Sequence, residues 1–312
     1  MSSSIDTLPD QLDVSIPPES RELGRLSLFF VCITLTTVGA YWASLRLRGV
    51  PVVDVLSSPG IAGLALPTLA YARFRGIDLS PTRPRPADVG TTLAVVALPL
   101  LALVATTIGT PLVFGTSFAA AVGSTYHPQA SFLTALSQWA ESTILTGVGY
   151  GVLTATVFEL LRSRASMPTK HAVVFTAGLG VFFDGMLRGS AYTVVVFPKQ
   201  WRLALFGILL VSTVAGGVSL GLFYRSVLER SIRVLYRPLF VPVFALGLIL
   251  IVAFAALFAD VPDGFEHVLW ALAFGSAAYG YDQTKSVVVP VVVLSLFGLS
   301  VPVSHFFELA VF

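Results

Sequence analysis

The sequence has few charged residues: Asp, Glu, Lys and Arg together make up 12% of its 312 residues. Soluble domains carry about 25%, because a folded core needs polar side chains to cover it. Hydrophobic residues make up 55% of the chain, so much of the apolar surface must face lipid. The composition excludes an ordinary soluble domain and makes the lipid bilayer the first expected partner.

The chain also has only one cysteine and little net charge. The single Cys32 lies within the first apolar run and cannot form a disulfide within the chain. The net charge is only +2, and no basic run with interleaved aromatic residues occurs, so no nucleic-acid partner is expected.

Sequence signals for metal or nucleophilic chemistry are equally scarce. The chain has four histidines, no two of them four residues apart, and it has no His-Glu-x-x-His helix. Cys32 has no neighbouring base, and no glycine-rich loop with a lysine is present to hold a phosphate. We therefore expect no metal and no cofactor.

Apolar runs of the length that crosses the hydrocarbon core of a bilayer dominate what is there. They predict an all-α fold, a polytopic transmembrane helical bundle of about nine spans, since helices satisfy the backbone in lipid. Residues 111–131 are semi-polar and predict a loop at the interface. The predicted spans are residues 26–45, 51–72, 89–110, 132–160, 172–197, 203–224, 238–259, 265–281 and 287–310.

The domain organisation follows from these runs. Residues 1–22 are polar, mildly acidic and contain prolines, which predicts a disordered cytoplasmic tail. Residues 23–312 then form one transmembrane helical domain. Because the tail is not basic and an apolar run follows it at once, the first run is expected to be a retained anchor and not a cleaved signal peptide.

Basic residues predict the orientation. Under this assignment, fourteen Lys and Arg residues lie on one face and four on the other. The positive-inside rule then places the N-terminus in the cytoplasm and the C-terminus outside an integral plasma membrane protein. The run at 132–160 is long and the run at 172–197 carries charge, so merging or splitting either gives eight or ten spans and reverses the C-terminus.

Small residues recur four apart in three runs, as in helices that approach closely in lipid. Such pairs indicate either packing within one monomer or the face of a homodimer. The pairs are Gly147 and Gly151, Gly217 and Gly221, and Ser276 and Gly280.

Ionisable residues within predicted spans are costly in lipid, and each needs a partner or a purpose. Asp184 and Arg188 are four apart on one helix face, and their simplest interpretation is an ion pair. Glu141 lies in a polar stretch of the fourth run. His305 and Glu308 are three apart near the C-terminus, where they are expected to reach water at the outer interface.

The stretch that runs Gly280-Tyr281-Asp282-Gln283-Thr284-Lys285-Ser286 and on to Pro290 resembles part of a known family. Intramembrane metalloproteases of the CAAX-protease and bacteriocin-processing group (CPBP, also called Abi) typically read Gly-Tyr-x-x-Thr-x-Ser here, then Pro and a His-x-x-x-Asn helix. In this chain Leu294 stands at the His position and Gly298 at the Asn position.

Two registers are possible for the upstream signatures of that family, Glu-Glu-x-x-x-Arg and Phe-x-x-x-His. The first, which makes residues 205–300 the CPBP-like part, matches Arg225 and puts Phe258 at the His position. The second puts Tyr150 and Gly151 at the glutamate pair and Asp184 at the His position. Neither register restores the catalytic residues of the family.

The resemblance implies a protease fold without its chemistry. The carboxylates and imidazoles of the family are taken to bind a metal or to activate water, and neither Leu, Gly nor Phe can do so. We therefore expect a pseudoenzyme, a membrane binding or scaffold module with another membrane protein or a second copy as possible partner. Two alternatives stay open: an active metalloprotease that uses relocated residues such as Glu141, Asp184 and His305, and a small-solute transporter.

Overall fold

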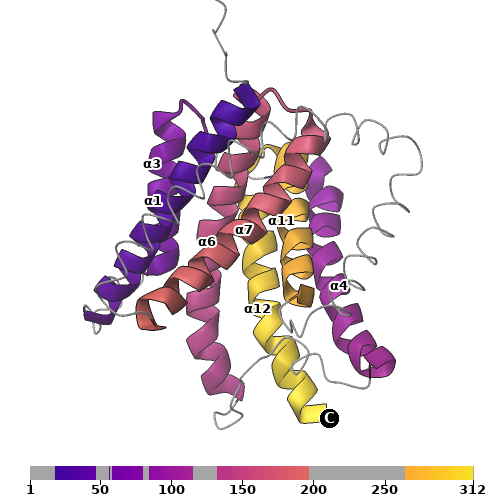
Figure 1. Ribbon diagram of the computed structural model, residues 1–312. Coiled ribbons are helices and arrows are strands. Elements are labelled where there is room, and N and C mark those ends of the chain that lie inside the picture. Colours follow the sequence, from indigo (N-terminus) through magenta and orange to yellow (C-terminus); the bar gives the residue numbers. More distant parts are fainter. Residues whose placement is uncertain are drawn as a thin grey trace, which may run out of the picture.

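Every regular element in the described part of the chain is a helix, as the apolar runs predict (Figure 1). The computed structural model describes residues 18–46, 56, 58–79, 84–114, 132–196 and 264–311. Side chains are described within these ranges at 19–44, 56, 58–79, 84–109, 112, 143–184 and 266–301. No strand occurs among them.

The helix boundaries follow the predicted spans closely. The elements are α1 (Pro18–Arg46), the π-helix η1 (Pro59–Ala65) that continues into α3 (Leu66–Phe74), the 3-10 turn η2 (Pro86–Asp88), α4 (Val89–Phe114), α6 (Phe132–Ser163), α7 (Thr169–Val196), α11 (Gly264–Thr284) and α12 (Val288–Val311). The predicted spans 203–224 and 238–259 lie outside the described residues, so the expected total of nine stays a prediction.

Three boundaries differ from the sequence expectation. In the predicted span 51–72, the π-helix η1 begins at Pro59 after the N-cap Ser58. Helix α1 begins at Pro18, within the predicted tail of residues 1–22, because proline suits the first helical turn and Glu19 interacts favourably with the helix dipole there. Ser20 and Glu22 are buried at this helix start. Helix α4 continues to Phe114, into the segment predicted as an interfacial loop.

The helices alternate in direction along one axis of the bundle. Helix α1 begins at the end drawn at the top of Figure 1, where α3, α6 and α11 finish and where α4, α7 and α12 start. Helix α12 ends at the opposite end, marked C. Helix α7 ends, and α11 begins, away from the top end of the bundle in Figure 1. The helices before residue 197 and those after residue 263 therefore follow the same alternation of direction.

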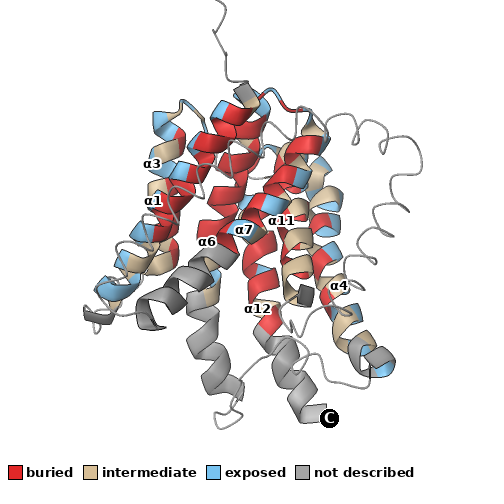
Figure 2. Ribbon diagram, viewed as in Figure 1, coloured by how far each residue is buried: buried red, intermediate tan, exposed pale blue. Residues whose placement is uncertain are grey.

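Three stretches of helix are long and apolar enough to cross a membrane within the described residues: Glu19–Ser44, Pro86–Gly109 and Thr143–Ser163. Helix α6 lies at the centre of the bundle and is largely buried, whereas α4 lies at its edge (Figure 2). Outward-facing Leu93, Leu101 and Ile108 of α4 are more than half exposed. A row of large apolar side chains of this kind is suited to lipid and not to water.

Glycines let α6 approach its neighbours to backbone contact. A Cβ atom on Gly147 would collide with the backbone of Ser295 in α12, and one on Gly151 would lie 2.5 Å from the Cα of Val291. The Ser295 hydroxyl also donates to the carbonyl oxygen of Ile144 across this contact, at 3.3 Å. This predicted small-residue pair therefore packs within one monomer.

Gly149, between these two glycines of α6, packs against a different neighbour. A Cβ on Gly149 would lie 2.6 Å from the carbonyl oxygen of Gly60 in η1, and Gly60 in turn faces the backbone of Leu145. Gly280 is also used inside the bundle, where a Cβ would meet Val289 at 2.7 Å. The pair Gly217 and Gly221 lies outside the described residues.

Charged groups gather at the end where α1 begins. The buried carboxylate of Glu22 binds Arg75 at 2.8 Å, and Arg164 donates to the Arg75 carbonyl at 2.9 Å. Burial alone would lower the pKa of Arg75, but the hydrogen bond from Arg75 to Glu22 raises it above its ordinary value. These contacts join the first helix to the ends of α3 and α6.

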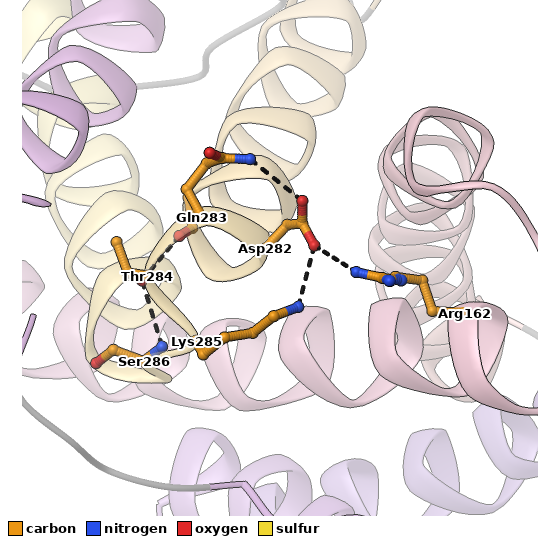
Figure 3. Close-up of polar contacts among 7 residues, drawn as sticks. Arg162, Asp282, Gln283, Thr284, Lys285 and Ser286 are labelled. Atoms are coloured by element: carbon orange, nitrogen blue, oxygen red, sulfur yellow. Dashed lines mark hydrogen bonds and ion pairs between the residues drawn. The ribbon is translucent and has the colours of Figure 1, made fainter.

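A second ion cluster closes the α11–α12 turn at the same end (Figure 3). The Asp282 carboxylate binds Arg162 of α6 at 2.7 Å and Lys285 at 3.0 Å. Both cations are partly exposed, so their stabilising effect is small. Asp282 and Lys285 belong to the stretch whose Gly-Tyr-x-x-Thr-x-Ser pattern resembles the CPBP group, and here the stretch forms a helix end and a tight turn.

The close contact between α6 and α12 predicts that alanine lowers the stability of the protein at Gly147 but not at Gly90. Gly147→Ala should lower the free energy of unfolding in detergent by about 1–3 kcal/mol, because overpacking forces the two backbones apart. Gly90→Ala is the matched control, since a Cβ there meets nothing within 4 Å. It should change stability by no more than about 1 kcal/mol, in the stabilising direction. Equal effects of the two substitutions, measured as thermal melting, would contradict this packing.

Candidate functional site: a cavity within the helical bundle

A cavity of about 270 Å³, partly open to the outside, lies among the described helices. Side chains from α6, α7, α11 and α12 surround it. It is lined by Thr143, Thr146, Gly147, Tyr150, Asp184, Glu266, Trp270, Leu294, Gly298 and Val301. Since these residues come from four separate stretches of the chain, only the folded bundle brings them together.

Tyr150 and Asp184 form one polar part of the cavity lining. The Tyr150 hydroxyl donates to Oδ1 of Asp184 at 2.6 Å, and both side chains are buried. Tyr150 lies in sequence between the glycines that bring α6 close to α12, so the position of its backbone is set by that packing. A short hydrogen bond to a carboxylate is stronger than one between neutral groups, which fixes the orientation of Asp184 toward α6.

Glu266 and Trp270 form a second polar pair at the start of α11. The indole Nε1 of Trp270 donates to Oε1 of Glu266 at 3.0 Å, one helical turn away. Glu266 is part of the first turn of α11, where the helix dipole favours negative charge. The cavity therefore has a carboxylate contributed by α7 and another contributed by α11.

Aromatic rings hold these polar groups in place. The Tyr150 ring meets Trp270 and Phe274 edge to face, with centroids 5.8 Å and 5.4 Å apart. Trp270 meets Phe297 in the same way at 5.0 Å. Such pairs stabilise their geometry beyond simple burial, so the cavity is bounded by a rigid cluster.

Helix α12 contributes the apolar side of the cavity. Leu294 is fully buried and lines it. A Cβ built on Gly298 would lie 2.9 Å from Thr143 and 3.6 Å from the Trp270 ring. A side chain at 298 would therefore press against Thr143, so the absence of a side chain at Gly298 lets α12 pack closely here.

The residues predicted as a site are only partly gathered here. Asp184 lines the cavity, and it accepts a hydrogen bond from Tyr150. The side chains of Glu141, Arg188, His305 and Glu308 lie outside the described ones, although their backbones are within α6, α7 and α12. The predicted Asp184–Arg188 ion pair therefore stays a prediction.

The two registers of the family resemblance fare differently. Arg225 and Phe258 of the first register lie outside the described residues. In the second register, Tyr150, Asp184, Leu294 and Gly298 all line the one cavity.

The sequence also contains a Gly-x-Ser-x-Gly string at 217–221, which lies outside the described residues. The string falls within a predicted apolar span and not at the strand-to-helix turn that a nucleophile elbow requires.

The rest of the pattern residues have structural roles. Gly280 packs against Val289, and the Thr284 hydroxyl donates to the Gly280 carbonyl at 2.8 Å. Tyr281 is buried and meets Phe158 of α6 edge to face. Pro290 is buried in the first turn of α12, where proline is tolerated.

Sequence reasoning missed the part that Glu266 and Trp270 play. Their spacing of four on a helix is a signal for a side-chain hydrogen bond, but that spacing does not show that the pair lines a cavity. Thr143 and Thr146 were missed as well, because their exposure to a cavity depends on packing.

Among the described residues no three His, Cys, Asp or Glu side chains cluster as metal ligands. The chemistry that the described lining offers is hydrogen bonding and negative charge.

The Tyr150–Asp184 bond predicts a stability difference between two identical substitutions. Tyr150→Phe should lower the free energy of unfolding by about 1–3 kcal/mol, because a buried carboxylate loses a donor. Tyr279→Phe is the control, since that side chain is 47% exposed, and it should change stability by less than about 0.5 kcal/mol. Melting temperatures in detergent that fall equally for both would contradict the role of the bond.

Comparison of the chain with protein-family models, with curated proteins and with solved structures finds no match. The resemblance to the CPBP group therefore rests on the residues quoted for it, and it stays a prediction.

Proposed function

We propose that the chain is a multi-pass protein of the cell membrane and a non-catalytic binding module whose ligand site is the cavity between α6, α7, α11 and α12. We infer that its fold is a degenerate form of the CPBP protease fold. Its N-terminus lies in the cytoplasm.

This proposal rests on one observation: Tyr150, Asp184, Leu294 and Gly298 all line the same cavity. The second register assigns these four positions to the Glu, His, His and Asn of the family. A chance resemblance between apolar helices has no reason to bring four such positions to a single cavity. This supports the second register, while the distinguishing residues of the first, Arg225 and Phe258, lie outside the described residues.

The chemistry of those positions supports binding over catalysis. Leu294 and Gly298 have no group that ligates a metal or moves a proton, and both line the cavity. The Asp184 carboxylate and the Tyr150 hydroxyl remain, and they are joined to each other. An acceptor-rich, partly open cavity with one apolar side is suited to holding a ligand in a fixed orientation.

Helix directions and charge support the membrane topology. Two further spans, at 203–224 and 238–259, would cross the membrane from the end where α7 finishes and cross back to the end where α11 starts. This pair of crossings would keep the alternation of helix directions seen in Figure 1. The described basic residues Arg75, Arg162, Arg164 and Lys285 gather at the end where α1 begins. The positive-inside rule makes that end cytoplasmic.

The topology predicts opposite labelling of two serine-to-cysteine variants in a Cys32→Ser background. Ser166 lies in the loop between α6 and α7, and Ser44 near the other end of α1. A membrane-impermeant maleimide should label Ser44→Cys in intact cells and Ser166→Cys only after lysis. The reverse pattern would overturn the orientation, and labelling of both in intact cells would overturn the spanning topology.

The absence of proteolytic activity is the direct functional expectation. Purified protein incubated with a prenylated CAAX peptide, or with a transmembrane peptide, should release no fragment above buffer, with Zn²⁺ or with a chelator. Mass spectrometry of the peptides measures this. Zinc-dependent cleavage that Asp184→Asn abolishes would show an active enzyme and overturn the proposal. Glu159→Gln, which removes a carboxylate that does not line the cavity, is the matched control.

A further inference from the structure

We propose that the outward faces of α1 and α3 bind anionic phospholipids, whose headgroup phosphates lie against Arg25 and Arg73 and whose acyl chains lie along the apolar side chains next to them. The inference goes beyond the proposed function, since it uses none of the residues that line the cavity. It requires only that the two helices lie in a bilayer.

Helix α1 presents one exposed row of side chains that is basic at its start and apolar along its middle. The row consists of Arg25, Leu28, Cys32, Leu35 and Trp42, all of them exposed. Spacings of three, four and seven residues put these side chains on one face of a helix. Basic residues, then apolar ones, then an aromatic ring match the headgroups, the acyl chains and the far interface of a bilayer.

Helix α3 presents a second row of the same kind. Leu66, Leu69 and Arg73 are exposed and are three and four residues apart. Phe74, next to Arg73, is 85% exposed. A large aromatic ring with so much exposed surface is suited to lipid and not to water. The row on α3 is therefore also apolar along its length and basic at one end.

The two rows lie on neighbouring helices and are basic at the same end. Phe29 of α1 stacks on Tyr71 of α3, with ring centroids 4.0 Å apart. Both helices lie at the edge of the bundle opposite α4 (Figure 1). Because α1 begins where α3 finishes, Arg25 and Arg73 both lie at the end where the ion pairs gather.

Positive charge at this end exceeds the carboxylates that contact it. Oε2 of the buried Glu22 lies 2.8 Å from Arg75 but 3.8 Å from Arg25, which is 56% exposed. Arg164 donates to a neutral group, the Arg75 carbonyl. Within the described part of the chain, no carboxylate contacts Arg73. Arg25 and Arg73 are therefore the cations most available to a ligand.

The chemistry of these groups favours an anionic phospholipid. The guanidinium fork matches a phosphate, and basic side chains at a membrane surface attract anionic lipids. A zwitterionic headgroup would also bring an ammonium group, and the carboxylate that contacts Arg25 is buried and bound to Arg75. A soluble phosphate would leave the apolar rows of both helices without a partner.

Thermal melting of the full chain, purified in detergent and freed of phospholipid, tests the proposal. Phosphatidylglycerol should raise the melting temperature at a concentration at least about fivefold lower than phosphatidylcholine with the same acyl chains, because only phosphatidylglycerol adds net negative charge. The difference should shrink between about 0.1 M and about 1 M NaCl, since salt screens exposed charges. Equal effects of the two lipids at low salt would overturn the proposal.

Substitutions assign the preference to residues. Arg73→Gln should lower the preference for phosphatidylglycerol by about threefold or more, and adding Arg25→Gln should lower it further. Arg162→Gln is the matched control. It removes the same charge at the same end, but Arg162 is already bound to Asp282 at 2.7 Å, so the preference should not change. An equal loss in Arg73→Gln and Arg162→Gln would show an effect of net charge alone and overturn the site.

A charge reversal keeps the test open if the double variant fails to fold. The Arg73 side chain is exposed and contacts no described carboxylate, so single substitutions there should fold. Arg73→Glu should lower the preference more than Arg73→Gln does, because it repels the phosphate. A preference that Arg73→Glu leaves intact would overturn the assignment to Arg73.

Glycerol 3-phosphate distinguishes a lipid from a soluble phosphate. It carries the phosphate without acyl chains, so at the same concentration as the phospholipid it should leave the melting temperature unchanged. Stabilisation equal to that by phosphatidylglycerol would show a site for soluble anions and overturn the lipid assignment.

Failure of this inference is distinct from failure of the proposed function. A chain that cleaves no peptide and melts alike in both lipids contradicts the lipid site and leaves the non-catalytic module standing. A chain that cleaves peptide and still prefers phosphatidylglycerol through Arg73 overturns the proposed function and supports the lipid site.

Discussion

The close approach of α6 to its neighbours is the constraint on which the rest of the described structure depends. Gly147 and Gly151 bring its backbone against α12, and Gly149 brings the opposite side against η1. In a bilayer, lipid tails are as apolar as leucine, so helices associate through close packing and not through burial of apolar surface from water. Tyr150 lies within this glycine series, and its position is therefore set by backbone contacts.

Polar groups in the interior are then arranged around that central helix. Tyr150 binds Asp184 of α7, and Trp270 binds Glu266 within α11. The Asp184 carboxylate is buried and the Glu266 carboxylate is partly buried. Burying such groups has a cost, and a hydrogen-bond donor reduces it. Because the donors are aromatic, the same side chains that satisfy the acids also build the rigid cluster with Phe274 and Phe297. Stability of the interior and the shape of the cavity thus have a common origin.

The two ends of the bundle differ in chemistry, and this difference bears on function. Ion pairs at Glu22 and Asp282 join helix ends far apart in sequence on the side where α1 begins. The cavity instead draws its Glu266 from the start of α11, at the other end of that helix. The ion pairs that join the helix ends and the Glu266 of the cavity therefore lie at different ends of α11.

The sequence by itself determined the solvent and the helices, because the length and apolarity of a run are local properties. The runs predicted α1, α4, α6, α7, α11 and α12 to within several residues, and the charge of Asp184 marked it as a residue needing a partner. Tertiary structure decided which partner: Tyr150 lies 34 positions away in the chain, and no periodicity encodes that contact. It also decided that Glu266, Trp270, Leu294 and Gly298 share one cavity, since convergence of four helices depends on their packing and not on the composition of any one.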